Sequence, residues 1–150
     1  MARVPFYLVD IDGTVADLTH RLRLIQGDKP DWDGFFDLCW NDKPIWEVIE
    51  TVKLLKEAGA DIIMLTGRSE VIRLKTMDWL HQYGIPFDAL YMRSRGDRRE
   101  DYIVKGELLD EVLKEYGMRG IIGAFEDRKQ VVDMYRKRGL RVFQVAEGDF

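Results

Sequence analysis

Residues Tyr7–Val15 read Tyr-Leu-Val-Asp-Ile-Asp-Gly-Thr-Val, and this stretch decides the fold that we predict. An apolar, β-branched run ends in two carboxylates one residue apart, Asp10 and Asp12, and Gly13 follows at once. Successive side chains of a strand point to opposite faces, so we expect both carboxylates on one side and a sharp turn at Gly13. Because two adjacent carboxylates repel, a bound cation or a shared proton is also expected. The competing interpretation is an Asx-turn that closes an ordinary strand.

Polar residues also follow the later apolar segments. Thr66–Arg68 comes directly after the run Asp61–Leu65, and Glu126–Asp127 comes directly after Gly120–Phe125. Lys105 opens an apolar-periodic segment between them. Each feature also has a structural interpretation: a threonine can end a strand, a lysine can be solvated, and acidic residues favour helix N-termini.

Apolar periodicity predicts alternating strands and helices along the whole chain. Such alternation indicates an α/β fold with a parallel sheet of about five strands and helices on both faces, whose ligands bind at the carboxyl ends of the strands. The predicted strands are Val4–Val9, 61–65, 89–92, 120–125 and 141–145, and the predicted helices are Trp46–Glu57, Ser69–Tyr83, 101–116 and 129–137.

Composition favours one compact domain over residues 1–150, because 46% hydrophobic residues suffice for one substantial core. The single cysteine, Cys39, excludes an internal disulfide and a cysteine-based metal site. No apolar run reaches the roughly 20 residues that span a bilayer, so a soluble, cytoplasmic protein is expected. A net charge of −4 argues against a broad nucleic-acid footprint, so any such contact should be local.

In their order along the chain, the four polar motifs resemble those of the haloacid dehalogenase (HAD) superfamily of phosphohydrolases. Three later stretches are similar to the 3′-phosphatase domain of phage-type polynucleotide kinase-phosphatases: Arg93–Lys105, Glu126–Arg136 and Phe143–Phe150. This resemblance implies a Rossmann-like HAD core with a small helical cap inserted after the first strand. The kinase half of such enzymes needs a phosphate-binding loop that contains Gly-Lys, and this chain has no Gly-Lys pair.

The HAD resemblance implies a chemical role for each carboxylate. Asp10 would be the nucleophile that forms an aspartyl-phosphate, and Asp12 would protonate the leaving oxygen and then activate water. Asp10 and Asp127 would bind Mg²⁺ through their carboxylates and Asp12 through its main-chain carbonyl, because Mg²⁺ suits oxygen ligands.

The resemblance also implies groups that contact the phosphate. Thr66 and Lys105 would bind its oxygens, with Gly67 beside them. Arg68 and Arg93 lie inside the matched motifs and would grip a neighbouring phosphodiester. Further candidates for a basic entrance are Arg21, Arg23, Arg95, Arg98 and Arg99.

The insert at about residues 18–44 carries an aromatic stripe at helical spacing, formed by Trp32, Phe35, Phe36, Cys39 and Trp40. Docking of the cap onto the core is the first interpretation of this stripe. Stacking of one ring, such as Trp32, on a nucleobase is the second. Two histidines, His20 and His81, lack partners at ligand spacing and are interpreted as surface or packing residues.

The resemblance therefore implies a Mg²⁺-dependent phosphomonoester hydrolase that removes 3′-phosphate from DNA or RNA ends. A nucleotidase or general small-molecule HAD phosphatase is the alternative, because one fold hosts many substrates. The expected partner is a phosphorylated nucleic-acid end or a nucleotide. A non-catalytic binding module is disfavoured, because every expected catalytic position carries a competent residue.

Overall fold

The computed structural model describes residues 4–148 and has the predicted α/β architecture. One parallel sheet runs in the order β5-β4-β1-β6-β7, with β1 at its centre. Asp149 and Phe150, the end of the last matched stretch, lie outside the described residues. The strands are β1 Phe6–Val9, β4 Asp61–Ser69, β5 Ala89–Arg93, β6 Ile121–Arg128 and β7 Val142–Gly148.

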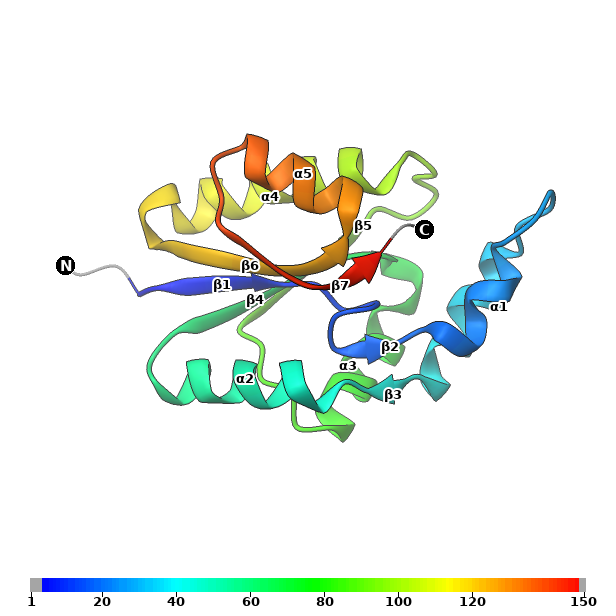
Figure 1. Ribbon diagram of the computed structural model, residues 1–150, viewed down its shortest axis with the longest axis horizontal. Helices are drawn as coiled ribbons and strands as arrows, with labels where there is room; N and C mark the ends of the chain where they lie inside the picture. Colours follow the sequence, from blue (N-terminus) through cyan, green and yellow to red (C-terminus); the bar gives the residue numbers. More distant parts are fainter. Residues whose placement is uncertain (1–3, 149–150) are drawn as a thin grey trace.

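Two layers of helices enclose the sheet (Figure 1). Helices α2 (Trp46–Glu57) and α3 (Arg73–Gln82) cover one face, and α4 (Asp101–Tyr116) and α5 (Lys129–Lys137) cover the other. Each interface buries an apolar cluster of its own. The predicted bounds of α2, α4 and α5 are confirmed. These helices were predictable because each has an apolar face toward the sheet and a polar outer face.

Strands β4, β6 and β7 each continue beyond the predicted end. The register of β4 against β5 shifts between Thr66 and Ser69, and that of β6 against β7 shifts between Glu126 and Arg128. Such irregularities locally disrupt the ladder and change the direction of the side chains that follow. The helix predicted from Ser69 begins instead as the 3₁₀ turn η3 (Glu70–Ile72), whose Val71 N–H donates to Ser69 Oγ at 3.3 Å.

The insert after β1 is anchored by two short strands, β2 (Ala16–Asp17) and β3 (Lys43–Pro44), which pair antiparallel. Figure 1 shows α1 beyond the carboxyl ends of the sheet strands, at the end of the molecule opposite the N-terminus. The insert therefore lies on the side where the polar motifs end. Its helical segments are η1 Thr19–Leu24, α1 Trp32–Asp37 and η2 Leu38–Asn41.

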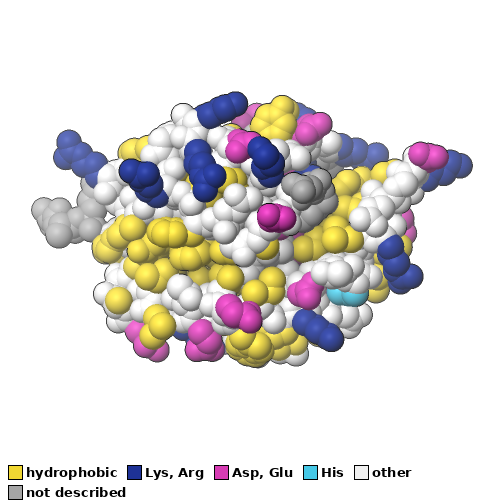
Figure 2. Space-filling model, in the orientation of Figure 1, with side chains coloured by type: hydrophobic (Ala, Val, Ile, Leu, Met, Phe, Trp, Pro, Cys, Tyr) yellow, Lys and Arg dark blue, Asp and Glu magenta, His cyan; other side chains and the backbone are white. Residues whose placement is uncertain are grey.

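Charge is unevenly distributed over the surface. Figure 2 shows basic side chains gathered over the layer that contains α5, which carries Lys129, Arg136 and Lys137. Within residues 4–148, no helix has both the length and the apolar character that a membrane span requires.

Candidate active site

A tight loop after β1 fixes the orientation of Asp10. The main-chain N–H of Asp10 donates to Phe125 O at 3.0 Å, and the Thr14 hydroxyl donates to Asp10 Oδ2 at 2.9 Å. Gly13 allows this loop on two grounds: its φ is +83°, and a Cβ there would meet Asp127 Oδ2 at 2.0 Å. The sequence Asp-x-Asp-Gly-Thr thus brings Asp10 and Asp127, 117 positions apart in the chain, to the same buried place.

Lys105, on α4, extends toward Asp10 and is 2% exposed. Its Nζ lies 2.8 Å from Asp10 Oδ1, 2.8 Å from Glu126 Oε2 and 3.5 Å from Asp101 Oδ2. Burial disfavours the ammonium, but the surrounding carboxylates outweigh burial and hold the Lys105 pKa well above its usual range. Lys105 is therefore a fixed positive charge and not a solvated helix residue.

Three buried carboxylates gather beside this one ammonium. One oxygen from each of Asp10, Glu126 and Asp127 lies within 4.8 Å of the others. Burial and the negative charge of Asp10 raise the Asp127 pKa to about 8 and that of Glu126 well above its usual value. A divalent cation would relieve this crowding, and an all-oxygen donor set suits Mg²⁺. The residues present thus fit the metal that the family resemblance implies.

Both carboxylate oxygens of Glu126 accept hydrogen bonds from other groups of the protein. Its Oε1 accepts the main-chain N–H groups of Asp127 at 3.2 Å and of Arg128 at 3.1 Å, while Oε2 accepts from Lys105. Glu126 therefore orients both Lys105 and the turn that carries Asp127.

Asp12 has different partners from Asp10. Its Oδ1 accepts from Arg21 Nη2 at 2.5 Å and from Arg68 Nη2 at 2.6 Å, and its Oδ2 accepts from Arg68 Nε at 3.2 Å. Burial works against the charge on Asp12, but Arg68 and Arg21 outweigh it and hold the pKa of this carboxyl well below its usual range. The two carboxylates of the first motif thus have separate partners: Asp10 lies with Lys105, Glu126 and Asp127, whereas Asp12 lies between two arginines.

Asp42, at the end of the insert, accepts hydrogen bonds from both arginines that contact Asp12. It is 2% exposed and accepts from Arg21 Nε at 2.8 Å, from Arg21 Nη2 at 2.7 Å and from Arg68 Nη2 at 3.3 Å. His20 Nε2 lies 2.7 Å from Asp42 Oδ1, so this histidine packs into the same network. Sequence reasoning missed Asp42, and it placed Arg21 at an entrance.

Thr66 and Gly67 lie at the carboxyl end of β4, next to the end of β1. Val9 pairs with Met64 in the parallel ladder, so Asp10 and Thr66 both fall just beyond that pair. Thr66 is 1% exposed and its Oγ1 accepts the main-chain N–H of Arg68 at 3.2 Å. A Cβ at Gly67 would meet Asp101 Oδ1 at 2.0 Å, so a side chain at this position would displace the Asp101 carboxylate.

Arg68 and Arg93 do not line an entrance, contrary to our expectation. Arg68 is 0% exposed because β4 continues past Thr66 and turns the guanidinium inward to Asp12. Arg93 donates to the main-chain oxygens of Gly67 at 2.8 Å and Arg99 at 2.7 Å, and to Asp101 Oδ1 at 3.1 Å. Both guanidinium groups are thus used within the protein.

Comparison with known proteins agrees with this geometry. The sequence model of the family described as the polynucleotide kinase PNKP phosphatase domain matches residues 5–150. The chain belongs to this family. It is a HAD-type phosphatase, and its substrate is therefore a phosphorylated compound.

Two relatives are larger proteins. The chain is 31% identical over 134 residues to the "Putative bifunctional polynucleotide kinase/RNA ligase" of Autographa californica nuclear polyhedrosis virus, covering 86% of this phosphatase and 17% of that protein. A chain in the structure of a Pnkp1/Rnl/Hen1 complex is 33% identical with a TM-score of 0.82, covering 99% of this phosphatase and 47% of that chain. This phosphatase thus spans less than half the length of these relatives.

A more distant structure shows the fold alone. The class C acid phosphatase of Bacillus anthracis with tungstate bound is 16% identical with a TM-score of 0.70, covering 100% of this phosphatase and 69% of that chain. The five-stranded parallel sheet with helices on both faces is therefore shared well beyond the family.

Proposed function

We propose that this phosphatase removes a 3′-phosphate from DNA or RNA ends through an aspartyl-phosphate on Asp10, with Mg²⁺ as cofactor. One observation carries the mechanism: of the two carboxylates of one motif, Asp10 lies in the group that could hold a metal ion and beside Lys105, whereas Asp12 is held apart from it by two arginines. Pairs of titratable groups in contrasting environments are typical of divided roles in catalysis. The polynucleotide substrate is supported by the family match over residues 5–150.

Asp10 is oriented for attack by its two neighbours. Lys105 donates to Oδ1 and Thr14 donates to Oδ2, so both oxygens of the carboxylate are held in place. In the first step a bond forms between an Asp10 oxygen and phosphorus while the bond from phosphorus to the 3′ oxygen breaks. Lys105 offsets the charge that develops on the transferring group.

Asp12 moves the proton in this scheme. The arginines keep it ionised in the free protein, which is the form that activates water against the aspartyl-phosphate. The arriving phosphate brings further negative charge beside Asp12 and so raises its proton affinity. With its proton affinity raised, Asp12 takes up a proton from solvent and gives it to the leaving 3′ oxygen. The resulting carboxylate then takes a proton from the water that attacks the aspartyl-phosphate.

The carboxylates of Asp10 and Asp127 and the main-chain carbonyl of Asp12 would hold Mg²⁺. Bound there, the ion supplies the positive charge that lets an anionic nucleophile approach an anionic phosphate. Gly13 belongs to this arrangement because any side chain at its position would displace the Asp127 carboxylate.

The remaining predicted residues act on the phosphate or on the other groups. Thr66 accepts from a main-chain N–H, so its hydroxyl proton can turn toward a phosphate oxygen. Arg68 is reassigned from gripping substrate to positioning Asp12. Arg93 is reassigned to holding the main chain at Gly67.

A nucleotidase is the second candidate function. The buried state of Arg68 and the internal bonds of Arg93 favour it, because neither guanidinium is placed to hold a second phosphate.

A substrate panel separates the two functions. Steady-state kcat/KM is measured for 3′-phosphorylated and 5′-phosphorylated oligonucleotides, 3′- and 5′-mononucleotides and p-nitrophenyl phosphate. The proposed function predicts that the 3′-phosphorylated oligonucleotide has the highest value. A mononucleotide preferred over every oligonucleotide would leave the nucleotidase in its place.

A further inference from the structure

Three aromatic side chains of helix α1 contact one another. The ring of Trp32 lies 5.6 Å from that of Phe35 in an edge-on arrangement and 6.1 Å from that of Phe36 at an interplanar angle of 29°. Phe35 is 4% exposed and Phe36 packs against the apolar cluster between the sheet and helices α2 and α3, whereas Trp32 is 48% exposed. The indole is therefore supported from within and open to solvent.

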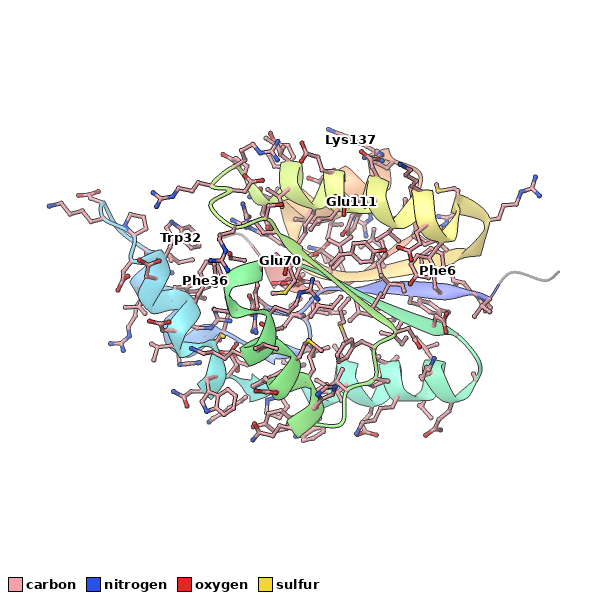
Figure 3. The ribbon with its side chains drawn as sticks, turned by 180° about the vertical axis from the view of Figure 1, so that it is seen from behind. Phe6, Trp32, Phe36, Glu70, Glu111 and Lys137 are labelled. Atoms are coloured by element: carbon pink, nitrogen blue, oxygen red, sulfur yellow. The ribbon has the colours of Figure 1, made fainter. Side chains whose placement is uncertain are left out.

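This cluster is connected directly to the active site. The Arg21 guanidinium carbon lies 4.3 Å from the centre of the Phe35 ring, and Arg21 Nη1 donates to Phe35 O at 3.2 Å. The same guanidinium donates to Asp12. Two contacting side chains, Phe35 and Arg21, thus separate Trp32 from Asp12. Figure 3 shows Trp32 and Phe36 on the side of α1 that faces the sheet.

We propose that Trp32 is a stacking platform for the nucleobase of the nucleotide whose phosphate enters the site. This inference rests on the proposed function, and it adds a binding site that the phosphate chemistry does not require. In the proposed function Asp12 protonates the leaving 3′ oxygen, and Asp12 is bonded to Arg21 of the insert, so we place the sugar and base of the substrate on the insert side. Every base has a π-face, so one indole accepts any terminal base without reading sequence.

The charges of α1 favour a base over a phosphodiester at this place. Asp31 and Asp33 lie at the start of the helix and Asp37 at its end, and no lysine or arginine falls within Trp32–Asp37. The Asp37 carboxylate has Lys75 Nζ of α3 at 3.9 Å, so the negative charge is concentrated at the start of the helix, beside Trp32. These carboxylates repel a nucleic-acid backbone but not the neutral face of a base. Trp32 therefore contacts the terminal nucleoside, and the rest of the nucleic-acid chain extends away from α1.

The test uses substrates that differ only in the terminal base, and variants that differ only in the ring. Values of kcat/KM are measured for a 3′-phosphorylated oligonucleotide with a normal terminal nucleotide, for the same oligonucleotide with an abasic terminal sugar, and for p-nitrophenyl phosphate. The variants are Trp32→Ala, Trp32→Phe and Trp40→Ala. Trp40 is a matched control, because it is also 48% exposed and belongs to the same insert but lies in η2.

The expected loss for Trp32→Ala on the normal end is about 5- to 150-fold, which corresponds to ~1–3 kcal/mol of base stacking. Trp32→Phe should retain most of the activity, and Trp40→Ala and all rates on p-nitrophenyl phosphate should stay unchanged. In Trp32→Ala the normal and abasic ends should be cleaved equally. Equal losses on all three substrates, or no preference of the wild type for the normal end, would overturn the proposal.

Failure of the proposed function gives a different result. If the wild type cleaves mononucleotides but no oligonucleotide end, the 3′-end activity is wrong, and the same variants are compared on a nucleoside monophosphate and ribose phosphate. Loss of the base preference in Trp32→Ala then still supports stacking. If no base-containing phosphate is preferred over ribose phosphate, the stacking proposal is wrong as well.

Discussion

Arg21 Nη2 lies 2.5 Å from Asp12 Oδ1, so a side chain of the insert is in direct contact with the loop after β1. Arg21 is 0% exposed, and its guanidinium also contacts Asp42 and Phe35, both from the insert. A buried ion pair broken on one side costs several kcal/mol. The insert and the Asp12 loop therefore behave as one unit, and the orientation of Asp12 depends on residues 21 and 42.

The first prediction is that Asp42→Asn impairs general-acid catalysis in particular. Without the Asp42 charge, Arg21 and Arg68 lose their shared anchor, and Asp12 loses its fixed position. A 3′-alkoxide needs a proton on leaving, whereas p-nitrophenolate does not. We expect kcat/KM to fall roughly 10- to 100-fold more on the oligonucleotide than on p-nitrophenyl phosphate. Circular dichroism checks that the variant folds, and equal losses on both substrates would contradict this role.

The second prediction concerns the metal. EDTA should abolish activity and Mg²⁺ should restore it. Asp127→Ala should raise the Mg²⁺ concentration for half-maximal activity at least 10-fold, because a carboxylate ligand is lost.

Gly13→Ala should also raise this Mg²⁺ concentration, since its Cβ would displace Asp127 Oδ2. Asp133→Ala is the matched control, because Asp133 is a solvent-accessible acidic residue on α5 that bonds only Lys129 among the contacts described for residues 4–148. Full activity of Asp127→Ala at low Mg²⁺ would place the metal elsewhere.

The third prediction is that Arg93→Ala affects all substrates alike. Arg93 holds Gly67 O and Asp101, and its loss should disturb the β4 end that carries Thr66. We expect a similar fractional loss of kcat/KM on oligonucleotide and p-nitrophenyl phosphate, within about threefold. A loss confined to the oligonucleotide would return Arg93 to a direct contact with substrate.

The fourth prediction concerns stability and pH. Burial opposes the charge on Asp101, but Lys105, Arg128 and Arg93 outweigh it and lower its pKa. A carboxyl whose folded-state pKa is depressed adds stability above its unfolded pKa, about 3.9, and that stability is lost as pH falls through the folded value. Asp101→Asn should therefore lower the free energy of unfolding at pH 7 by about 3 kcal/mol and flatten its decline in acid. Urea denaturation at pH 3 to 7 measures this, and parallel curves for wild type and variant would contradict it.

Sequence patterns predict the parts of this protein that follow local rules. Alternating apolar segments predicted the sheet and both helix layers, and the Asp-x-Asp-Gly-Thr and Glu-Asp pairs predicted that Asp10 and Asp127 end on the same edge. Arg21 and Asp42 follow no such period, because they meet Asp12 only after the insert folds back. Arg68 was misplaced for a local reason: β4 was predicted to end at Leu65, whereas its continuation to Ser69 places Thr66 and Arg68 both inward.

The central claim is that Asp10 receives the phosphoryl group of a 3′-phosphorylated nucleic-acid end. The most direct test is a single-turnover reaction with an oligonucleotide radiolabelled in its 3′-phosphate, quenched in acid, followed by peptide mapping. We predict transient label on the peptide that contains Asp10, and neither label nor product with Asp10→Asn. Release of labelled phosphate without any protein-bound label, or turnover by Asp10→Asn above a tenth of the wild-type rate, would contradict the account.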